Sequence, residues 1–103
     1  MKNEILTISE ENTLEGVRLS LKGRVYAVNA GTLERKLEEI LKKGQSSIIL
    51  NMEQIEYLCS TGIKIILKAF KDALKAGGKL RIEKPSENVR SVLEITTLDE
   101  ILL

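Results

Sequence analysis

A buried strand and an amphipathic helix meet at Tyr57-Leu58-Cys59-Ser60-Thr61-Gly62. The strand before this junction contains Ile48-Ile49-Leu50, which shows no polar alternation and continues to Met52. Such a run predicts a central strand covered on both faces, as in a parallel sheet flanked by helices. After the junction, apolar residues recur at helical spacing until a glycine pair ends the pattern, at Ile63, Ile66, Leu67, Phe70 and Leu74, then Gly77-Gly78.

The hydroxyl groups at the junction stand at the start of a helix, which carries unpaired N–H groups and partial positive charge. Ser60 therefore either caps the helix by accepting a backbone hydrogen bond or holds an anion such as a phosphate, and the two roles are compatible. Thr61 either shapes the helix start or is itself modified. Gly62 either permits close approach of a partner or of the sheet, or is simply tolerated in the first turn.

The residues before the junction predict two strands and a helix. Residues 4–9 form a strand candidate, followed by a polar turn at 10–12. Residues 17–22 alternate apolar and polar, which predicts a strand with one buried face. A loop over 23–30 then leads to an amphipathic helix carrying Leu33, Leu37, Ile40 and Leu41, with Asn29 as a possible N-cap and Gly44 as its stop.

The residues after the second helix predict a short strand at Leu80 and Ile82 and a last helix that follows Pro85-Ser86 and ends near Thr96. Residues 101–103 are either a terminal edge strand or a packing tail. The whole order is β-β-α-β-α-β-α. It predicts one α/β domain over residues 1–103, with an open mixed β-sheet flanked by helices.

The composition narrows the classes of function. Sixteen Lys and Arg residues against fifteen Asp and Glu residues give a net charge of +1, too balanced for nucleic-acid binding or a polybasic membrane anchor. The absence of histidine removes the commonest general base and metal ligand, so we expect no enzyme, no catalytic residues, and no metal or other cofactor. A single cysteine and the lack of a long apolar segment indicate a cytoplasmic protein.

Four landmarks carry a resemblance to a known family. In chain order they are residues 23–30, the apolar strand ending at Leu50-Asn51, residues 57–63, and residues 89–98. Together they resemble the STAS domain of bacterial anti-sigma factor antagonists over nearly the whole chain. The core of that resemblance is a hydrophobic-Asp-Ser-Ser/Thr-Gly signature at the start of the second helix. Ser60 stands where that family has its phosphorylated serine.

The resemblance implies partner switching. Unmodified Ser60 would lie on the surface that binds an anti-sigma factor, typically a serine kinase that uses ATP, and binding would release the sigma factor. Phosphorylation of Ser60 would end this binding, and a serine phosphatase would reset the switch. The expected partner-binding residues are Tyr26, Asn29, Cys59, Ser60, Thr61, Gly62 and Lys64. The alternative is a phosphorylation-independent STAS scaffold subunit of a signalling or transport assembly.

The chain departs from the family pattern in front of Ser60 and in the loop after the second strand. Cys59 replaces the usual aspartate, and Arg24 and Tyr26 replace two acidic residues. If those carboxylates guide a kinase, this protein answers to a divergent partner or is not phosphorylated. Cys59 itself is either a small buried residue or a redox-active thiol at a helix start.

A stripe of lysines follows the second helix opposite its apolar face, at positions 64, 68, 71 and 75. One explanation is a solvated face on which Asp72 offsets Lys68 at spacing i+4. The other is a basic docking strip for an acidic partner beside Ser60, which would act mainly on association rate.

Overall fold

The computed structural model describes residues 5–103, which form a mixed sheet and its helices. The strands, in spatial order, are β1 (Leu6–Thr13), β2 (Gly16–Val25), β3 (Ser47–Leu58) and β4 (Lys79–Glu83). The helices are α1 (Ala30–Lys42), α2 (Ser60–Lys75), α3 (Glu87–Ile95) and α4 (Asp99–Leu102). This order confirms the predicted α/β class and adds a short final helix.

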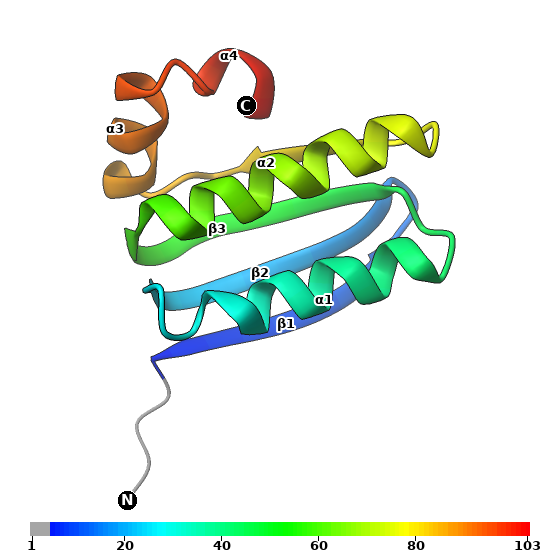
Figure 1. Ribbon diagram of the computed structural model, residues 1–103, viewed down its shortest axis with the longest axis horizontal. Coiled ribbons are helices and arrows are strands. Elements are labelled where there is room, and N and C mark those ends of the chain that lie inside the picture. Colours follow the sequence, from blue (N-terminus) through cyan, green and yellow to red (C-terminus); the bar gives the residue numbers. More distant parts are fainter. Residues whose placement is uncertain (1–4) are drawn as a thin grey trace, which may run out of the picture.

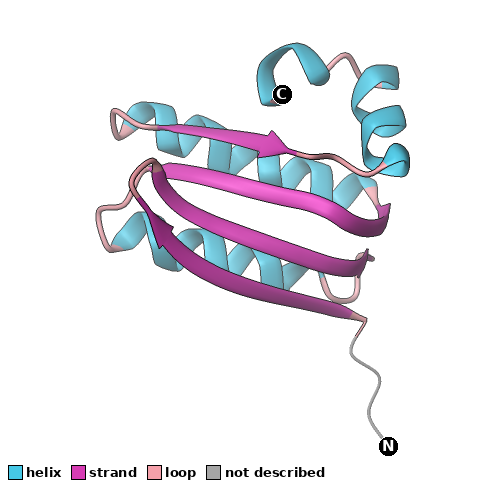
Figure 2. Ribbon diagram, turned by 180° about the vertical axis from the view of Figure 1, so that it is seen from behind, coloured by secondary structure: helices cyan, strands magenta, loops and turns pink. Residues whose placement is uncertain are grey.

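The topology places the carboxyl ends of three strands at one end of the molecule. β1 pairs antiparallel with β2, whereas β2, β3 and β4 run parallel. The crossover helices α1 and α2 lie on the same face of the sheet (Figure 1), and the view from behind shows the strands with no helix in front of them (Figure 2). The parallel strands therefore all end at the left of Figure 1, where α2 and α3 begin.

The hydrophobic core lies between the sheet and these two helices. The alternation predicted for β2 is confirmed, because Val17, Leu19 and Leu21 are buried and their neighbours face the other side. Helix α1 contributes Leu33, Leu37 and Ile40 to the same core, and α2 contributes Ile66, Ala69 and Ala73. Each helix therefore buries one stripe, as its apolar spacing requires.

The central strand is covered on both faces, as predicted, but helices cover only one of them. Ile49 points to the face without helices, yet only 3% of it is exposed. Its neighbours across the sheet are Arg18 on β2 and Arg81 on β4, and Arg18 Nε lies 2.8 Å from a carboxylate oxygen of Glu83. Long charged side chains can cover apolar surface with their methylene stems. Ion-paired arginines therefore cover Ile49 in place of a helix.

The first hairpin is longer than its polar residues predict. The expected turn at 10–12 is wrong, because those residues belong to β1 and pair with β2, and the turn falls at Leu14 and Glu15. Glu4, the start of the expected strand, lies outside the described residues. Ion pairs offset the two central acids of the strand. Glu10 contacts Lys36 at 2.8 Å, and Glu11 contacts Arg18 at 3.5 Å.

The loop predicted over 23–30 begins only after Val25, because β2 continues through a bulge at Gly23. Gly23 has φ +116°, and a Cβ there would collide with the carbonyl oxygen of Ile5. Only glycine meets both conditions. The predicted stop of α1 is confirmed at Gly44, which has φ +87°.

The C-terminal helices attach at the edge of the sheet beside β4. Ser86 Oγ accepts a hydrogen bond from the Val89 N–H at 3.2 Å and donates one to the Ile55 carbonyl at 2.6 Å. Asn88 Nδ2 donates to the Glu56 carbonyl at 2.7 Å. These bonds fix α3 to the part of β3 that extends beyond β4. Residues 101–103 are no edge strand, since Leu102 is buried within α4 as a packing tail.

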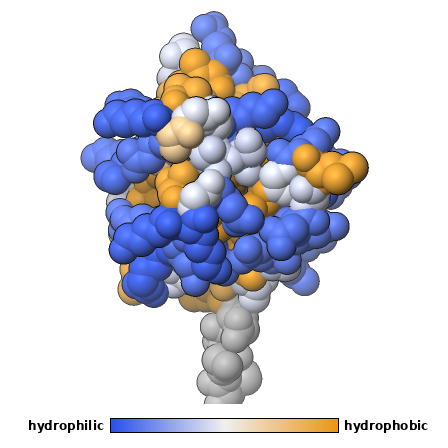
Figure 3. Space-filling model, turned by 90° about the vertical axis from the view of Figure 1, so that its right-hand side faces the viewer, coloured by the Kyte–Doolittle hydropathy of each residue, from blue (hydrophilic) through white to orange (hydrophobic). Residues whose placement is uncertain are grey.

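The end of the molecule opposite to Ser60 faces the viewer in Figure 3, and its surface is mainly hydrophilic with separate apolar patches. No helix within residues 5–103 combines the length and apolar character that crossing a bilayer would need.

Candidate functional site

The cap of α2 is Cys59, not Ser60. Cys59 has extended backbone angles, φ −80° and ψ 169°, and its Sγ accepts a hydrogen bond from the Gly62 N–H at 3.4 Å. Its own N–H donates to the Val25 carbonyl at 3.0 Å, which links the start of α2 to the end of β2. The thiol is half-buried against the core. Of the two roles that the sequence left open for Ser60, the capping role is therefore wrong.

Ser60 is the first residue of α2, and its side chain is exposed. Because Cys59 supplies the cap, the Ser60 hydroxyl makes no hydrogen bond with any residue of 5–103. It stands beside the free N–H groups of the first helical turn, where the helix dipole favours negative charge. The local geometry therefore leaves this hydroxyl exposed at a position where a negative charge would be stabilised.

Thr61 and Gly62 behave differently although they are neighbours. Thr61 is exposed, whereas Gly62 is buried against the sheet. A Cβ on Gly62 would lie 2.8 Å from Leu58 Cδ1 and 2.8 Å from Val25 Cγ1. Gly62 thus permits close approach of the helix to the strand ends, and it is not available to a partner.

Asn29 holds the loop between β2 and α1. Its Oδ1 accepts a hydrogen bond from the Tyr26 N–H at 2.8 Å, and its Nδ2 donates to the Arg24 carbonyl at 3.0 Å. Asn29 occupies the N-cap position of α1, but its side chain makes no bond to the helix. The predicted capping role is therefore wrong, because the amide is already used within the loop.

An aromatic pair borders the start of α2. The ring centroids of Tyr26 and Tyr57 lie 5.3 Å apart at an interplanar angle of 40°, which is within the range of favourable aromatic contacts. Tyr57 is 47% exposed and Val28, in the same loop, is 88% exposed. Neither Tyr57 nor Val28 is among the partner-binding residues predicted from the sequence. Tyr57 could have been found from the sequence, because it and Tyr26 stand at the ends of two strands that were predicted to be neighbours.

A salt bridge occupies the position where the family pattern is acidic. Arg24 Nε lies 3.0 Å from a carboxylate oxygen of Glu56, and both side chains are exposed. The Tyr26 hydroxyl and the Glu56 carboxylate raise the pKa of Arg24 above its ordinary value. The loop therefore presents a permanent positive charge near the tyrosine pair.

The lysine stripe lies on the exposed face of α2, as predicted. Lys68 Nζ contacts Asp72 at 3.1 Å, and this hydrogen bond together with the charge of Asp72 raises the pKa of Lys68. Lys64, Lys71 and Lys75 form no ion pair with another residue of 5–103. Lys64 stands one turn after Ser60, within reach of a group attached to it.

These residues form one surface at the carboxyl ends of the parallel strands. It brings together Tyr26, Cys59, Ser60, Thr61 and Lys64, while the Asn29 amide and Gly62 act beneath it. Within the described residues, no group of three or more potential metal ligands occurs. The arrangement presents an exposed hydroxyl, aromatic side chains and cations, which suits binding a protein and accepting a charged group.

Comparison with known proteins agrees with this geometry. The anti-sigma-B factor antagonist of Bacillus subtilis is 27% identical over 86 residues, covering 84% of this chain and 78% of that protein. The match to two further relatives, both from Thermotoga, covers 58% of the length of each of those proteins.

Solved structures share the fold. The anti-sigma factor antagonist SpoIIAA in its unphosphorylated form has a TM-score of 0.81 at 19% identity, covering 94% of this chain and 86% of that chain. The Bacillus cell fate determinant SpoIIAA in the phosphorylated form has a TM-score of 0.76 at 21% identity, covering 94% and 89%. The family model for the STAS domain matches residues 7–103, nearly the whole chain, so this protein belongs to the STAS domain family.

Proposed function

We propose that this protein is an anti-sigma factor antagonist that binds an anti-sigma factor with serine-kinase activity and is released when Ser60 is phosphorylated. The observation that supports this most is the state of the Ser60 hydroxyl, which is exposed at the start of α2 and is not needed as a cap. A relative carries the name of an anti-sigma-B factor antagonist. A protein of the same fold has been solved both with and without phosphorylation.

A phosphate on Ser60 would leave the helix intact. It would add a charge near −2 at the positive end of α2. The dipole and free N–H groups stabilise such a charge by roughly 0.3–2 kcal/mol. Lys64, one turn further and without an ion pair in the described chain, would add to this stabilisation.

The effect of the phosphate would therefore appear at the interface. Burying a charge without a matched partner costs several kcal/mol. Each increment of about 1.4 kcal/mol lowers affinity tenfold. One phosphate is thus enough to release a partner while the antagonist stays folded.

The surface around Ser60 also suggests the chemistry of the partner. Tyr57 and Val28 offer exposed apolar area, and the ring of Tyr26 packs against that of Tyr57. Of the lysines of α2 without an ion pair in the described chain, Lys64 stands nearest to this area, and Lys71 and Lys75 follow along the helix away from it. We expect a partner with an apolar contact at the tyrosine pair and acidic residues facing α2, whose association rate falls as salt rises.

The test uses purified protein with the anti-sigma kinase and ATP. Mass spectrometry should find one phosphate on Ser60 in the wild type and none in Ser60→Ala. Ser60→Asp should lose binding to the kinase, whereas Ser60→Ala should keep it. Ser91→Asp is the matched control, because Ser91 is an exposed serine on α3, and it should bind normally. Equal binding by all three variants would refute the switch.

The scaffold alternative has one specific observation in its favour. Cys59 and the Arg24–Glu56 ion pair leave no unpaired carboxylate where the family pattern has acids. A scaffold would bind its partners equally well with Ser60→Asp and would show no phosphoserine after incubation with the kinase. In either role we propose a regulatory protein that acts by binding and not by catalysis. Its cytoplasmic location stays a prediction.

A further inference from the structure

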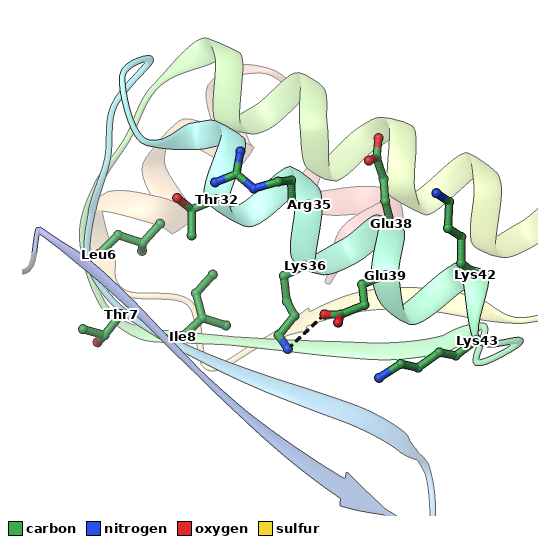
Figure 4. Close-up of a pocket in the computed structure, with 10 residues that line it drawn as sticks. All are labelled: Leu6, Thr7, Ile8, Thr32, Arg35, Lys36, Glu38, Glu39, Lys42 and Lys43. Atoms are coloured by element: carbon green, nitrogen blue, oxygen red, sulfur yellow. Dashed lines mark hydrogen bonds and ion pairs between the residues drawn. The ribbon is translucent and has the colours of Figure 1, made fainter.

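A second surface lies along the free edge of the sheet, between β1 and α1. The groove there has a volume of about 980 Å³. Leu6 and Ile8 point from β1 toward α1, while Lys36 and Lys43 reach from α1 toward β1 (Figure 4). None of the residues assigned to the Ser60 surface lines this groove. It is therefore a separate site.

The groove borders a strand edge that is open for pairing. β1 is the outermost strand on its side, and its eight residues pair only with β2 within the described chain. Its central acid on the groove side, Glu10, is held by Lys36 at 2.8 Å. Hydrogen bonding to Lys36 lowers the pKa of Glu10, so this ion pair persists at neutral pH. An open strand edge beside a helix is the arrangement that binds extended peptides by strand addition.

The charges around the groove are unbalanced. Lys36 is already paired with Glu10 and with Glu39, the latter at 3.3 Å. Arg35, Lys42 and Lys43 also line the groove, and none of them forms an ion pair with another residue of 5–103. The lining thus combines apolar side chains with four cations and with two carboxylates, Glu38 and Glu39, which leaves an excess of two positive charges.

We propose that this groove binds an extended acidic peptide segment, which adds as a strand to β1. Its side chains on the groove side would alternate between apolar groups that contact Leu6 and Ile8 and carboxylates that face Arg35, Lys42 and Lys43. A second copy of the chain fits less well, because its own groove lining would bring the same excess of positive charge. The proposal goes beyond the function of Ser60, since it uses no residue of that surface.

The probe is a fluorescein-labelled eight-residue peptide, Val-Thr-Glu-Thr-Val-Thr-Glu-Thr, which is matched in length to β1 and whose side chains on one face alternate between valine and glutamate. Fluorescence anisotropy should show saturable binding, and the same peptide with lysine in place of glutamate should not bind. Two further peptides carry N-methyl groups at the odd or the even positions. One of them should bind as the parent does and the other should not, because an added strand pairs along one edge only.

Variants of the protein test whether the peptide binds in this groove. The triple variant Arg35→Gln, Lys42→Gln, Lys43→Gln should weaken binding about tenfold or more, since the cations face the peptide carboxylates. The circular dichroism spectrum of each variant checks that its fold is unchanged. Hydrogen exchange should show slower exchange of β1 amides when the glutamate–valine peptide is bound.

The matched control is Lys64→Gln, Lys71→Gln, Lys75→Gln, which removes the same charge from exposed positions outside the groove. It should bind the peptide as the wild type does, and so should Ser60→Asp, whatever its effect on the kinase. Absence of binding at millimolar peptide would overturn the proposal. Equal loss in both triple variants, peptide-free dimerisation that protects β1, or binding of phosphatidylglycerol vesicles through the same cations would overturn it too.

Discussion

Replacing Gly62 with alanine tests whether close contact between α2 and the sheet positions Ser60. The new Cβ would lie 2.8 Å from methyl carbons of both Leu58 and Val25. Carbon atoms in proteins prefer separations of about 3.5–4.0 Å. Leu58 is 4% exposed and Val25 is fully buried, so neither methyl group has free space to move into.

The expected magnitude follows from two opposing effects. Overpacking of a core by one methyl group costs typically about 1–3 kcal/mol. Alanine is favoured over glycine inside a helix by up to about 1 kcal/mol, and by less in the first turn. Gly62→Ala should therefore lower the free energy of unfolding by roughly 1–2 kcal/mol. The start of α2 should also move away from the sheet and carry Ser60 with it.

Gly31→Ala is the matched control, because Gly31 also lies in the first turn of a long helix. A Cβ there would meet only the flexible end of Arg35, at 3.5 Å. This variant should be as stable as the wild type or more stable by up to about 1 kcal/mol. Urea unfolding of both variants measures the difference. If Gly62→Ala is no less stable than Gly31→Ala, the contact between α2 and the strand ends is looser than the 2.8 Å separations indicate.

Three further predictions concern other contacts. Cys59→Ala should lower the free energy of unfolding by about 1 kcal/mol through loss of the helix cap, whereas Cys59→Ser should keep the cap and the stability. Thermal unfolding measures the difference, and equal stability of the two variants would mean that the sulfur does not cap the helix. Asn29→Ala should lower the free energy of unfolding by about 1–3 kcal/mol, because two hydrogen bonds of the Tyr26 loop are lost. Asn29→Asp should lower it less, because the carboxylate keeps the acceptor for the Tyr26 N–H. Equal losses in thermal unfolding of the two variants would argue against the observed hydrogen bonds. Hydrogen bonding to Lys36 lowers the pKa of Glu10 from its ordinary value of 4.5. The Glu10–Lys36 ion pair therefore stabilises the fold fully above pH 4.5, and this stabilisation is lost as the pH falls through the lowered pKa. The difference in urea midpoint between wild type and Glu10→Gln should therefore narrow in acid, and a constant difference from neutral to acidic pH would contradict the ion pair.

The sequence was most informative where one face of an element is buried against the core. The apolar spacing of α1, α2 and β2 identified all three, since burial of a stripe or of alternate residues leaves a direct pattern. The polar end of β1 carried no such pattern. Its acids belong to a strand because Lys36 and Arg18, distant in sequence, offset their charge. Long-range ion pairs of this kind are invisible in a local window.

The candidate site was predictable in place and less so in detail. The junction before Ser60 was found because a strand ends and a helix begins there. Serine is ordinarily the better cap, yet backbone angles gave that role to Cys59. The choice between adjacent side chains depends on dihedral angles that the sequence does not display. The contact of Tyr57 with Tyr26 likewise depends on strand pairing across the sheet.

The antiparallel pairing of β1 has a practical consequence for experiments on this protein. It places Ile5 beside Arg24, at the end of the molecule where Ser60 lies. A label attached at Ile5 would therefore lie at the same end of the molecule as the Ser60 surface. Leu14, fully exposed in the opposite turn, is a better attachment point for a dye or a sensor chip. Immobilisation through that turn would leave the Ser60 surface free.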